Sequence, residues 1–460
     1  MKKTKIVCTL GPACDYRKIL EEMILSGMDI ARFNFSHENH KIHKKRIDLV
    51  REISQDLKKP VAILQDLAGP EIRLGEVSKG TFLKKGDEFF LTTKKILGNS
   101  KTVNVGYEKF PNYVFSGDRI LIDDGYIELE VLDALKDEVR TRILDGGELK
   151  SRKSVNVPNR FFEIPAITEK DLVDVEFGIK NNVDFIALSF VTKSEDILDF
   201  KKISEDIDII AKIEHPEAVK NIDSIIKVSD GVMVARGDLG VEVPPEEVPL
   251  IQKMIIRKCN LLLTPVITAT QMLESMIENP RPTRAEASDV ANAIFDGTDA
   301  VMLSGETSVG KYPVESVRFI KRIAKRAESV GISHEKKKIA SIRDAISEST
   351  YEISQSLNVK IILTPTKSGN TARLISQYRP KVPILALCVD EKTQRNLLLW
   401  WGIIPKLVKR TETTDEMLEI AVSEAKKFGL EKGDLAVITA GIPIGSKTNM
   451  IKVQRIGEKV

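Results

Sequence analysis

Two carboxylates and a lysine stand where short apolar segments of the chain end. Lys212 and Glu214 close the segment IDIIAKIE, and Asp238 follows GVMVARG. Residues two apart on a strand point to the same side, so Lys212 and Glu214 are expected to share a face. Carboxylate oxygens without histidine or cysteine suit Mg²⁺ or Mn²⁺ better than zinc. The pattern predicts a divalent-metal site at Glu214 and Asp238 with a lysine beside it.

Two arginines extend this group of charges. Arg32 lies in the segment DIARFNF, and Arg73 ends the segment DLAGPEIR. A phosphoryl group spreads negative charge over its oxygens during transfer, and catalysis then consists mainly of positioning and charge stabilisation. A metal, a lysine and two arginines suit that chemistry. The alternative, in which Lys212 only forms a structural ion pair with Glu214, stays open on this evidence.

The elements that must position these groups form a regular pattern. Short β-branched segments alternate with amphipathic helical stretches, which is typical of βα units and a parallel sheet. There are eight such segments, as in a (β/α)8 TIM barrel, and nearly all of them end in polar residues. Because barrel enzymes build their active sites at the carboxyl ends of the strands, we expect a catalytic mouth there. The predicted strands are 5–10, 29–35, 61–67, 185–191, 207–213, 231–237, 265–271 and 300–306.

Two further units interrupt or follow the barrel. Residues 70–154 contain short alternating strands and Asp- or Gly-rich turns, which predict an inserted all-β lid domain. An insertion at the mouth can close over a substrate. The barrel therefore consists of 1–69 and 155–334, with a lysine-rich linker near 335–338. Residues 339–460 alternate strands and helices again, which predicts a C-terminal open α/β domain with five strands.

The C-terminal domain offers a second candidate anion site. A strand is followed there by a hydroxyl-rich turn and a helix, and helix N-termini with nearby hydroxyls hold phosphate well. A regulatory phosphate site and an ordinary capped helix start both explain this turn. The residues concerned are Thr364, Thr366, Lys367, Ser368, Gly369 and Thr371.

The composition is that of an ordinary globular protein. The 460 residues include 70 basic and 67 acidic side chains, and the formal net charge is +3, which does not favour a nucleic-acid-coating protein. The four cysteines show no ligand-like pairing and are expected to be reduced, buried thiols. His37, His40 and His43 are interpreted as surface or capping residues rather than metal ligands. No stretch approaches the 18 apolar residues of a membrane span, and a cytoplasmic location is expected.

Several motifs resemble one family, pyruvate kinase, over essentially the whole chain. The most specific are ARFNFSH (31–37), DLAGPEIR (66–73), IIAKIEHPEAV (209–219), SDGVMVARGDLGVEVP (229–244) and the long segment 268–307. The resemblance implies phosphoryl transfer from phosphoenolpyruvate to ADP, giving pyruvate and ATP in the last step of glycolysis. It also implies a homotetramer, and the segment 364–371 resembles the phosphate-binding part of the family's sugar-phosphate effector site, with the choice between a phosphorylated allosteric effector and none left open. Two alternatives are another phosphoenolpyruvate-handling barrel and a non-catalytic metabolite-binding regulator on the same fold.

The resemblance also assigns roles to the strand-end residues. Lys212 is similar to the family's lysine that contacts the moving phosphoryl group. Glu214 and Asp238 match the ligands of a divalent ion, Mg²⁺ or Mn²⁺. The amides of Gly237 and Asp238, together with Thr270, match a cradle for the substrate carboxylate. Thr270 also matches the position near the enolate carbon, where a water-linked proton relay suits a hydroxyl group.

Further roles concern the nucleotide and a monovalent cation. Arg32 and Arg73 resemble the arginines on the transferring phosphate. Glu71 matches the potassium-requiring members of the family, in which a lysine does not supply the charge, so K⁺ is the second expected cofactor. The nucleotide-binding residues implied are Asn34, Phe35, Ser36, His37, Arg73 and Lys153. The potassium ligands implied are Asn34, Ser36, Asp66 and the carbonyl of Leu67.

Overall fold

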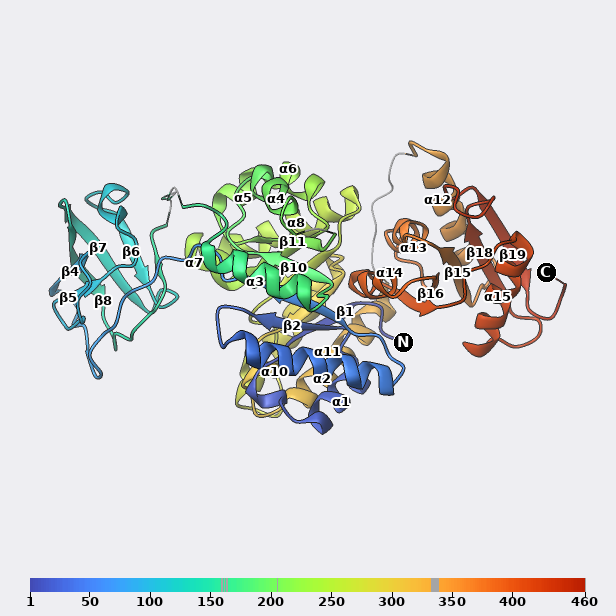
Figure 1. Cartoon of the computed structure of the whole chain (residues 1–460), viewed down its shortest axis with the longest axis horizontal. Helices are drawn as coiled ribbons and strands as arrows, with labels where there is room; N and C mark the ends of the chain where they lie inside the picture. Colours follow the sequence, from blue (N-terminus) through green and yellow to red (C-terminus); the bar gives the residue numbers. More distant parts are fainter. Residues whose placement is uncertain (159, 161, 163, 205, 332–338, 460) are drawn as a thin grey trace.

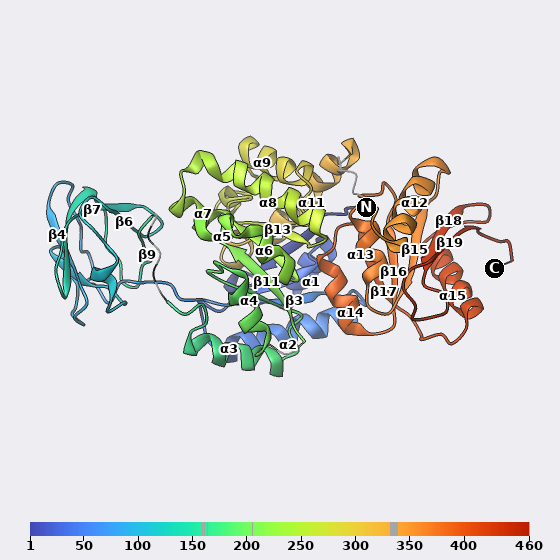
Figure 2. The same cartoon turned by 90° about the horizontal axis from the view of Figure 1, so that it is seen from above.

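The computed structural model describes residues 1–158, 160, 162, 164–204, 206–331 and 339–459. Three units follow one another along the longest axis of the molecule (Figure 1). A small all-β unit lies at one end, the barrel lies in the middle, and an α/β unit lies at the other end. The second view shows the same order and the two chain segments that join the β unit to the barrel (Figure 2).

The middle unit is a closed parallel barrel, as predicted. Its strands follow one another in the order β1-β14-β13-β12-β11-β10-β3-β2. Nearly every residue of these strands is buried, because side chains fill the inside and helices cover the outside. The strands are β1 (Lys5–Thr9), β2 (Ile30–Asn34), β3 (Ala62–Asp66), β10 (Phe185–Leu188), β11 (Asp208–Ile213), β12 (Gly231–Ala235), β13 (Val266–Ala269) and β14 (Ala300–Leu303).

The barrel helices begin at residues that can cap them. The side chains of Asn39, Thr168 and Thr283 accept hydrogen bonds from backbone N–H groups in the first turns of α2, α3 and α9. The helices are α1 (Arg17–Ser26), α2 (His40–Asp56), α3 (Glu169–Lys180), α4 (Ser194–Lys201), α5 (Pro216–Lys220), α6 (Ile222–Val228), α7 (Arg236–Glu242), α8 (Val248–Leu262), α9 (Arg284–Phe295), α10 (Gly305–Ser308) and α11 (Pro313–Val330). Short 3-10 turns lie at Pro12–Cys14, Pro245–Glu247 and Glu274–Ile277.

The β unit is a six-stranded sheet in the order β5-β4-β8-β7-β6-β9. Its buried face alternates with an exposed one along β7 and β8. The expected boundary at residue 154 is too early, because β9 pairs with β6 within this sheet. The strands are β4 (Glu88–Thr92), β5 (Thr102–Asn104), β6 (Arg119–Ile122), β7 (Ile127–Ala134), β8 (Glu138–Asp145) and β9 (Val155–Asn156), with a 3-10 turn at Phe110–Asn112.

The C-terminal unit is the expected five-stranded α/β sheet. Its order is β17-β16-β15-β18-β19, with only β19 antiparallel to its neighbour. The strands are β15 (Ile361–Thr366), β16 (Ile384–Cys388), β17 (Ile403–Leu407), β18 (Leu435–Ala440) and β19 (Met450–Arg455). The helices are α12 (Ile342–Ser356), α13 (Asn370–Ser376), α14 (Glu391–Asn396) and α15 (Thr414–Lys427), with a 3-10 turn at Leu397–Leu399. The predicted linker at 335–338 lies outside the described residues.

Two predictions about single residues can also be compared with the structure. All four cysteines are buried, as expected. Of the three histidines interpreted as surface or capping residues, His43 is instead 2% exposed, because its ring stacks on Phe35 at 4.3 Å between centroids. Within the described part of the chain, no helix combines the length and the apolar character that crossing a membrane requires.

Candidate active site at the barrel mouth

Lys212 lies at the centre of the mouth. Its Nζ is 2.7 Å from Glu214 Oε1 and 3.2 Å from Asp66 Oδ1. It also donates a hydrogen bond of 2.7 Å to Ser189 Oγ, which in turn donates to the carbonyl of Leu67 at 2.8 Å. These residues come from the ends of β3, β10 and β11, which are neighbours in the barrel. The structure therefore brings together strand-end groups that lie up to 148 positions apart in the sequence.

The mouth holds its charges in balance. Burial alone lowers the pKa of Lys212, but Asp66, Glu214 and Asp238 outweigh it and raise that pKa above its usual value. Burial likewise raises the pKa of Asp66, yet Lys212 and Arg32 bring it below the usual range. Lys212 therefore stays a cation, which a group that meets a phosphoryl oxygen must be.

The surroundings of Glu214, in contrast, favour the uncharged form of its side chain. Burial raises the pKa of its carboxyl group to about 7, the nearby Asp238 acts in the same direction, and Lys212 opposes the change. Its second oxygen accepts the N–H of Phe190 at 2.8 Å. Asp238, in the first turn of α7, is exposed to solvent in the mouth. The two predicted metal ligands are thus a buried carboxylate and an accessible one.

Arg32 is fixed on the opposite side of Asp66. Its Nε donates to Asp66 Oδ2 at 2.7 Å, and its Nη1 donates to Thr9 Oγ1 at 2.8 Å. Thr9 closes β1 and donates in turn to the carbonyl of Leu303. An arginine held by two partners loses little conformational freedom when it binds an anion.

The end of β13 carries a strained loop. Thr270 and Gln271 have φ angles of 65° and 52°, in the left-handed region that costs energy for such residues. Arg236 stabilises this loop, because its guanidinium donates to the carbonyls of Ala269 and Thr270 at 3.2 and 2.5 Å. Thr270 Oγ1 accepts the N–H of Gly237 at 2.8 Å. The three predicted cradle groups, Gly237, Asp238 and Thr270, therefore lie side by side.

Arg73 and Lys153 lie on the connection to the β unit. Arg73 Nη2 is 2.5 Å from Glu71 Oε2, and Lys153 Nζ is 2.7 Å from Asp123 Oδ1. The β unit stands away from the barrel and is joined to it by two chain segments (Figure 2). These two cations are thus carried by the segments that join the β unit to the barrel.

The predicted nucleotide segment after β2 divides into two parts. His37 is exposed, whereas the ring of Phe35 is buried among His40, His43 and Phe177. Only the backbone of Phe35 can therefore face a nucleotide. Asn34 Oδ1 accepts the N–H of Ser36 at 3.1 Å, which keeps these two residues beside the end of β3.

The candidate effector turn lines a cavity of about 370 Å³ in the C-terminal unit. Thr366, Lys367, Ser368 and Thr371 contribute to its wall, but Thr364 does not, because its side chain is fully buried. Gly369 holds the turn instead, since its N–H donates to Thr366 Oγ1 at 2.9 Å and its φ is 81°. The cavity wall also carries the basic residues Arg343, Lys409, Arg410 and Lys447.

Three residues of the mouth received no role from the sequence. Ser189 joins Lys212 to Leu67, Thr9 holds Arg32, and Arg236 holds the Thr270 loop. All three stand at or directly after the end of a barrel strand. The rule that strand ends carry function in such barrels applies to them as well. Their partners could not be read from the sequence.

The mouth suits a divalent ion that is partly held by substrate. Among the described residues no group of three or more His, Cys, Asp or Glu side chains could hold a metal. Mg²⁺ is often bound by one or two carboxylates plus water and phosphate oxygens. The pair Glu214 and Asp238 meets that requirement, and the donor set consists of oxygen alone.

The fold and the mouth together define a (β/α)8 barrel enzyme whose strand ends gather a lysine, an arginine and three carboxylates. The family model "Pyruvate kinase, barrel domain" matches residues 1–317, and "Pyruvate kinase, alpha/beta domain" matches residues 344–454. A pyruvate kinase of Geobacillus stearothermophilus is 49% identical over 99% of this chain and 81% of its own length. One of Staphylococcus epidermidis is 48% identical over 100% and 81%.

A solved structure agrees with these sequence relatives. The crystal structure of a pyruvate kinase from Cryptosporidium parvum superposes with a TM-score of 0.92 at 39% identity, covering 99% of this chain and 96% of the other. The chain belongs to the pyruvate kinase family. It is a phosphotransferase that moves a phosphoryl group from phosphoenolpyruvate to ADP. The predicted family, fold and enzyme class are confirmed.

Proposed function

We propose that this transfer takes place around Lys212, with Mg²⁺ or Mn²⁺ at Glu214 and Asp238 and K⁺ near Asp66. The observation that carries the proposal is the ammonium group of Lys212, whose side chain is only 11% exposed and which lies between Asp66 and Glu214. A fixed cation in a dry site stabilises charge that develops during a reaction far better than a solvated one. The divalent ion supplies Lewis-acid stabilisation of substrate oxygens when bound.

The residues of the mouth have separate roles in this transfer. Lys212 and Arg32 meet the oxygens of the phosphoryl group. The amides of Gly237 and Asp238 hold the substrate carboxylate beside Thr270. Thr270 Oγ1 donates to the carbonyl of Ala269 at 2.7 Å and accepts the N–H of Gly237, so a relay water would meet this hydroxyl at its remaining lone pair. Its hydroxyl is too weakly acidic to protonate carbon directly, and it orients a water-linked relay instead.

The potassium ligands are Asn34, Ser36, Asp66 and the carbonyl of Leu67. Asp66 Oδ1 is compatible with this assignment, because it is buried and its partner among the described residues is the Lys212 ammonium group, 3.2 Å away. A carboxylate oxygen has two lone pairs, so one cation on it leaves room for a second. Glu71 lies nearby without adding a positive charge of its own.

The nucleotide occupies the side of the mouth toward the β unit. Arg73 and Lys153 come from that unit's connection, and Asn34, the backbone of Phe35, Ser36 and His37 lie below them at the end of β2. Closure of the β unit brings the two cations onto the phosphates of ADP and excludes water. The unit corresponds to the expected insertion from residue 70, extended past 154 to include β9.

The remaining assignments concern regulation and assembly. A phosphorylated effector binds the cavity at Thr366, Lys367, Ser368 and Thr371, where hydroxyl groups and basic side chains converge. The enzyme is a cytoplasmic homotetramer in this proposal. Light scattering after gel filtration measures the assembly, and a titration of activity with sugar phosphates and AMP, with and without Lys367→Ala, measures the effector.

One coupled assay tests the proposal. Pyruvate formed from phosphoenolpyruvate is measured with all components, and then with ADP, Mg²⁺ or K⁺ left out in turn. We expect each omission to remove most of the activity, with tetramethylammonium replacing K⁺ to keep the ionic strength constant. Full activity without K⁺ contradicts the potassium site, and full activity without Mg²⁺ contradicts the assignment of Glu214 and Asp238.

A further inference from the structure

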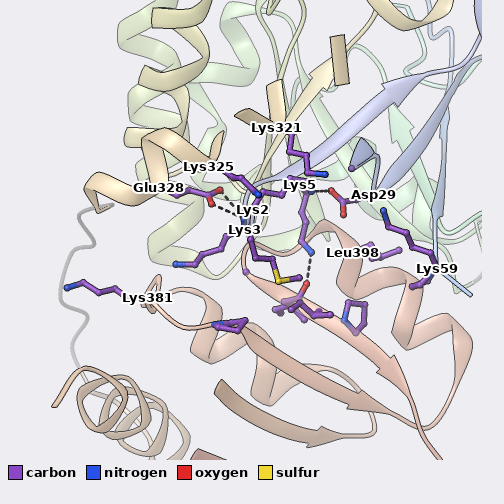
Figure 3. A pocket seen from close by; sticks show the side chains of 18 of the residues that line it. Lys2, Lys3, Lys5, Asp29, Lys59, Lys321, Lys325, Glu328, Lys381 and Leu398 are labelled. Atoms are coloured by element: carbon purple, nitrogen blue, oxygen red, sulfur yellow. Dashed lines mark hydrogen bonds and ion pairs between the residues drawn. The ribbon is translucent and has the colours of Figure 1, made fainter. Parts of the chain in front are cut away.

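A second large cavity lies far from the mouth. It has a volume of about 880 Å³ and opens between the amino-terminal face of the barrel and the C-terminal unit (Figure 3). Lys5 on β1, Asp29 just before β2 and Lys59 just before β3 line it from the barrel. Lys381 and the residues around Ile403 line it from the other unit. We call this space the basal cavity.

The wall of the basal cavity is strongly basic. Seven lysines but only two carboxylates line it, which leaves a formal charge of +5. The whole chain carries only +3, so the excess is a local feature. Figure 3 shows lysine side chains reaching it from both units. The lysines are Lys2, Lys3, Lys5, Lys59, Lys321, Lys325 and Lys381.

The two carboxylates are already engaged at the edge of the barrel. Asp29 forms an ion pair with Lys2 and accepts the N–H of Ile6 at 2.8 Å. Glu328 accepts the backbone N–H groups of Lys3 and Thr4 at 2.9 and 2.6 Å. Asp29 is thus paired with Lys2, whereas Glu328 keeps its charge, because backbone N–H groups are neutral; both charges are already counted in the excess of +5.

Three of the lysines have a structural explanation. The ammonium groups of Lys3, Lys5 and Lys59 donate to backbone carbonyls of Pro380, Ile403 and Ile24. Burial nevertheless penalises these charges, and it lowers the pKa of Lys5 to about 8. Bonding to a neutral carbonyl satisfies a donor but does not cancel its charge.

With Lys2 paired to Asp29, three lysines remain that have no such explanation. Lys321, Lys325 and Lys381 form neither an ion pair nor a hydrogen bond with any residue that the structure describes. Lys321 and Lys325 come from α11 in the barrel, whereas Lys381 comes from the loop before β16. Lys325 and Lys381 are exposed and Lys321 is half-buried, so solvent weakens the repulsion among these like charges but does not remove it, and an anion between the two units lowers its energy further.

We propose that the basal cavity binds a small soluble polyanion that carries two phosphate groups. Each phosphate carries a charge of about −1.5 to −2 near neutral pH, so two of them come close to balancing the cavity. A single phosphate leaves most of the excess in place. The volume is in the range of small-molecule sites, and lysine binds phosphate as a point charge from any direction. Such a ligand contacts both units at once and holds them together.

Calorimetry with inorganic pyrophosphate tests the proposal on the full-length protein in metal-free buffer. The decisive variant combines Lys321→Ala, Lys325→Ala and Lys381→Ala. A matched control combines Lys136→Ala, Lys227→Ala and Lys432→Ala, which removes the same charge from exposed lysines outside the cavity. A third variant, Lys367→Ala, alters the C-terminal effector cavity alone.

We expect the control and Lys367→Ala to keep a pyrophosphate site that the decisive variant weakens by about tenfold or more. Pyrophosphate should also raise the unfolding temperature of the wild type but not of the decisive variant. Equal affinity in all proteins overturns the proposal. So does loss of the site in Lys367→Ala alone, because the pyrophosphate then lies in the effector cavity.

Two further binding experiments identify the chemical class of the ligand. Inorganic phosphate should bind about tenfold or more weakly than pyrophosphate, and equal affinities contradict the requirement for two phosphate groups. Phosphatidylcholine vesicles containing a phosphoinositide bisphosphate should not co-sediment the protein. Co-sedimentation that the decisive variant abolishes would replace the soluble ligand by a lipid headgroup. Unchanged circular dichroism and basal activity of the decisive variant show that it is folded.

Discussion

The mouth and the basal cavity lie at opposite ends of the same barrel strands and treat lysine in opposite ways. At the mouth Lys212 faces the carboxylates of Asp66, Glu214 and Asp238, so its charge is balanced within the protein. In the basal cavity seven lysines face two carboxylates. β1, β2 and β3 connect the two regions, with Lys5, Asp29 and Lys59 near one end and Thr9, Arg32 and Asp66 at the other.

The two regions differ in whether the protein itself supplies the partners for their charged side chains. A balanced buried network is rigid and places its groups for chemistry, which suits a site where charge moves during a reaction. An unbalanced cluster has no such internal partner, and an anion lowers its energy directly. Chemistry is therefore assigned to the mouth, and binding to the basal cavity.

The largest effect is expected when two carboxylates of the mouth, Glu214 and Asp238, are replaced by amides. The double variant Glu214→Gln and Asp238→Asn should lower kcat/KM for phosphoenolpyruvate by roughly 10³-fold or more, because metal stabilisation amounts to several kcal/mol. Electron paramagnetic resonance with Mn²⁺ should show loss of the bound ion. Lys212→Met serves as the control that keeps Mn²⁺ bound. Retained Mn²⁺ binding in the double variant contradicts the metal assignment.

A smaller change exchanges the charge beside the mouth. Glu71→Lys places a positive charge where the wild type relies on K⁺, so the variant should be nearly independent of potassium. The wild type should lose about tenfold or more in kcat when tetramethylammonium replaces K⁺, equivalent to about 1.4 kcal/mol. The ratio of the two rates, with and without K⁺, is the quantity to measure in both proteins. Equal potassium dependence in the two proteins would show that Glu71 does not determine the requirement.

A positioning effect should come next in size. Arg236→Lys removes the planar group that holds the carbonyls of Ala269 and Thr270, and the left-handed loop should relax. We expect kcat to fall by about tenfold to 100-fold, as for a small misplacement of a reacting group, with Mn²⁺ binding unchanged. Arg284→Lys on the exposed start of α9 is the matched control. An unaltered kcat in Arg236→Lys would mean that the loop holds its shape without Arg236.

The smallest effect belongs to the basal cavity. Glu328→Gln raises its formal charge by one, so pyrophosphate should bind about two- to fivefold more tightly, in line with a single partly exposed charge pair. The unfolding temperature without ligand should fall, since Glu328 also accepts two backbone N–H groups. Weaker pyrophosphate binding in this variant would contradict the electrostatic account of the cavity.

Much of the barrel could be predicted because its strands are short apolar runs bounded by polar residues. The strand ends were less certain, since a side-chain pattern does not reveal backbone geometry. The segment 231–237 was expected to be extended, yet α7 begins at Arg236. Likewise Thr270 and Gln271 leave the strand in the left-handed region, which depends on Arg236 from the neighbouring strand end.

The mouth could be predicted as a set of residues but not as a network. Asp66 was expected only as a potassium ligand, whereas the structure pairs it with both Arg32 and Lys212. The basal cavity left no signal at all in the sequence. Its lysines are spread from position 2 to position 381, and only the contact between the barrel and the C-terminal unit gathers them.

The most direct test compares the two regions in one assay of pyruvate formation without added polyanion. Lys212→Met should reduce kcat by several orders of magnitude, because it removes the charge that meets the phosphoryl group. The variant with Lys321→Ala, Lys325→Ala and Lys381→Ala should stay within about twofold of the wild type, as expected for surface changes remote from the mouth. Substantial activity in Lys212→Met, or a comparable loss in the triple variant, would contradict the assignment of chemistry to the mouth alone.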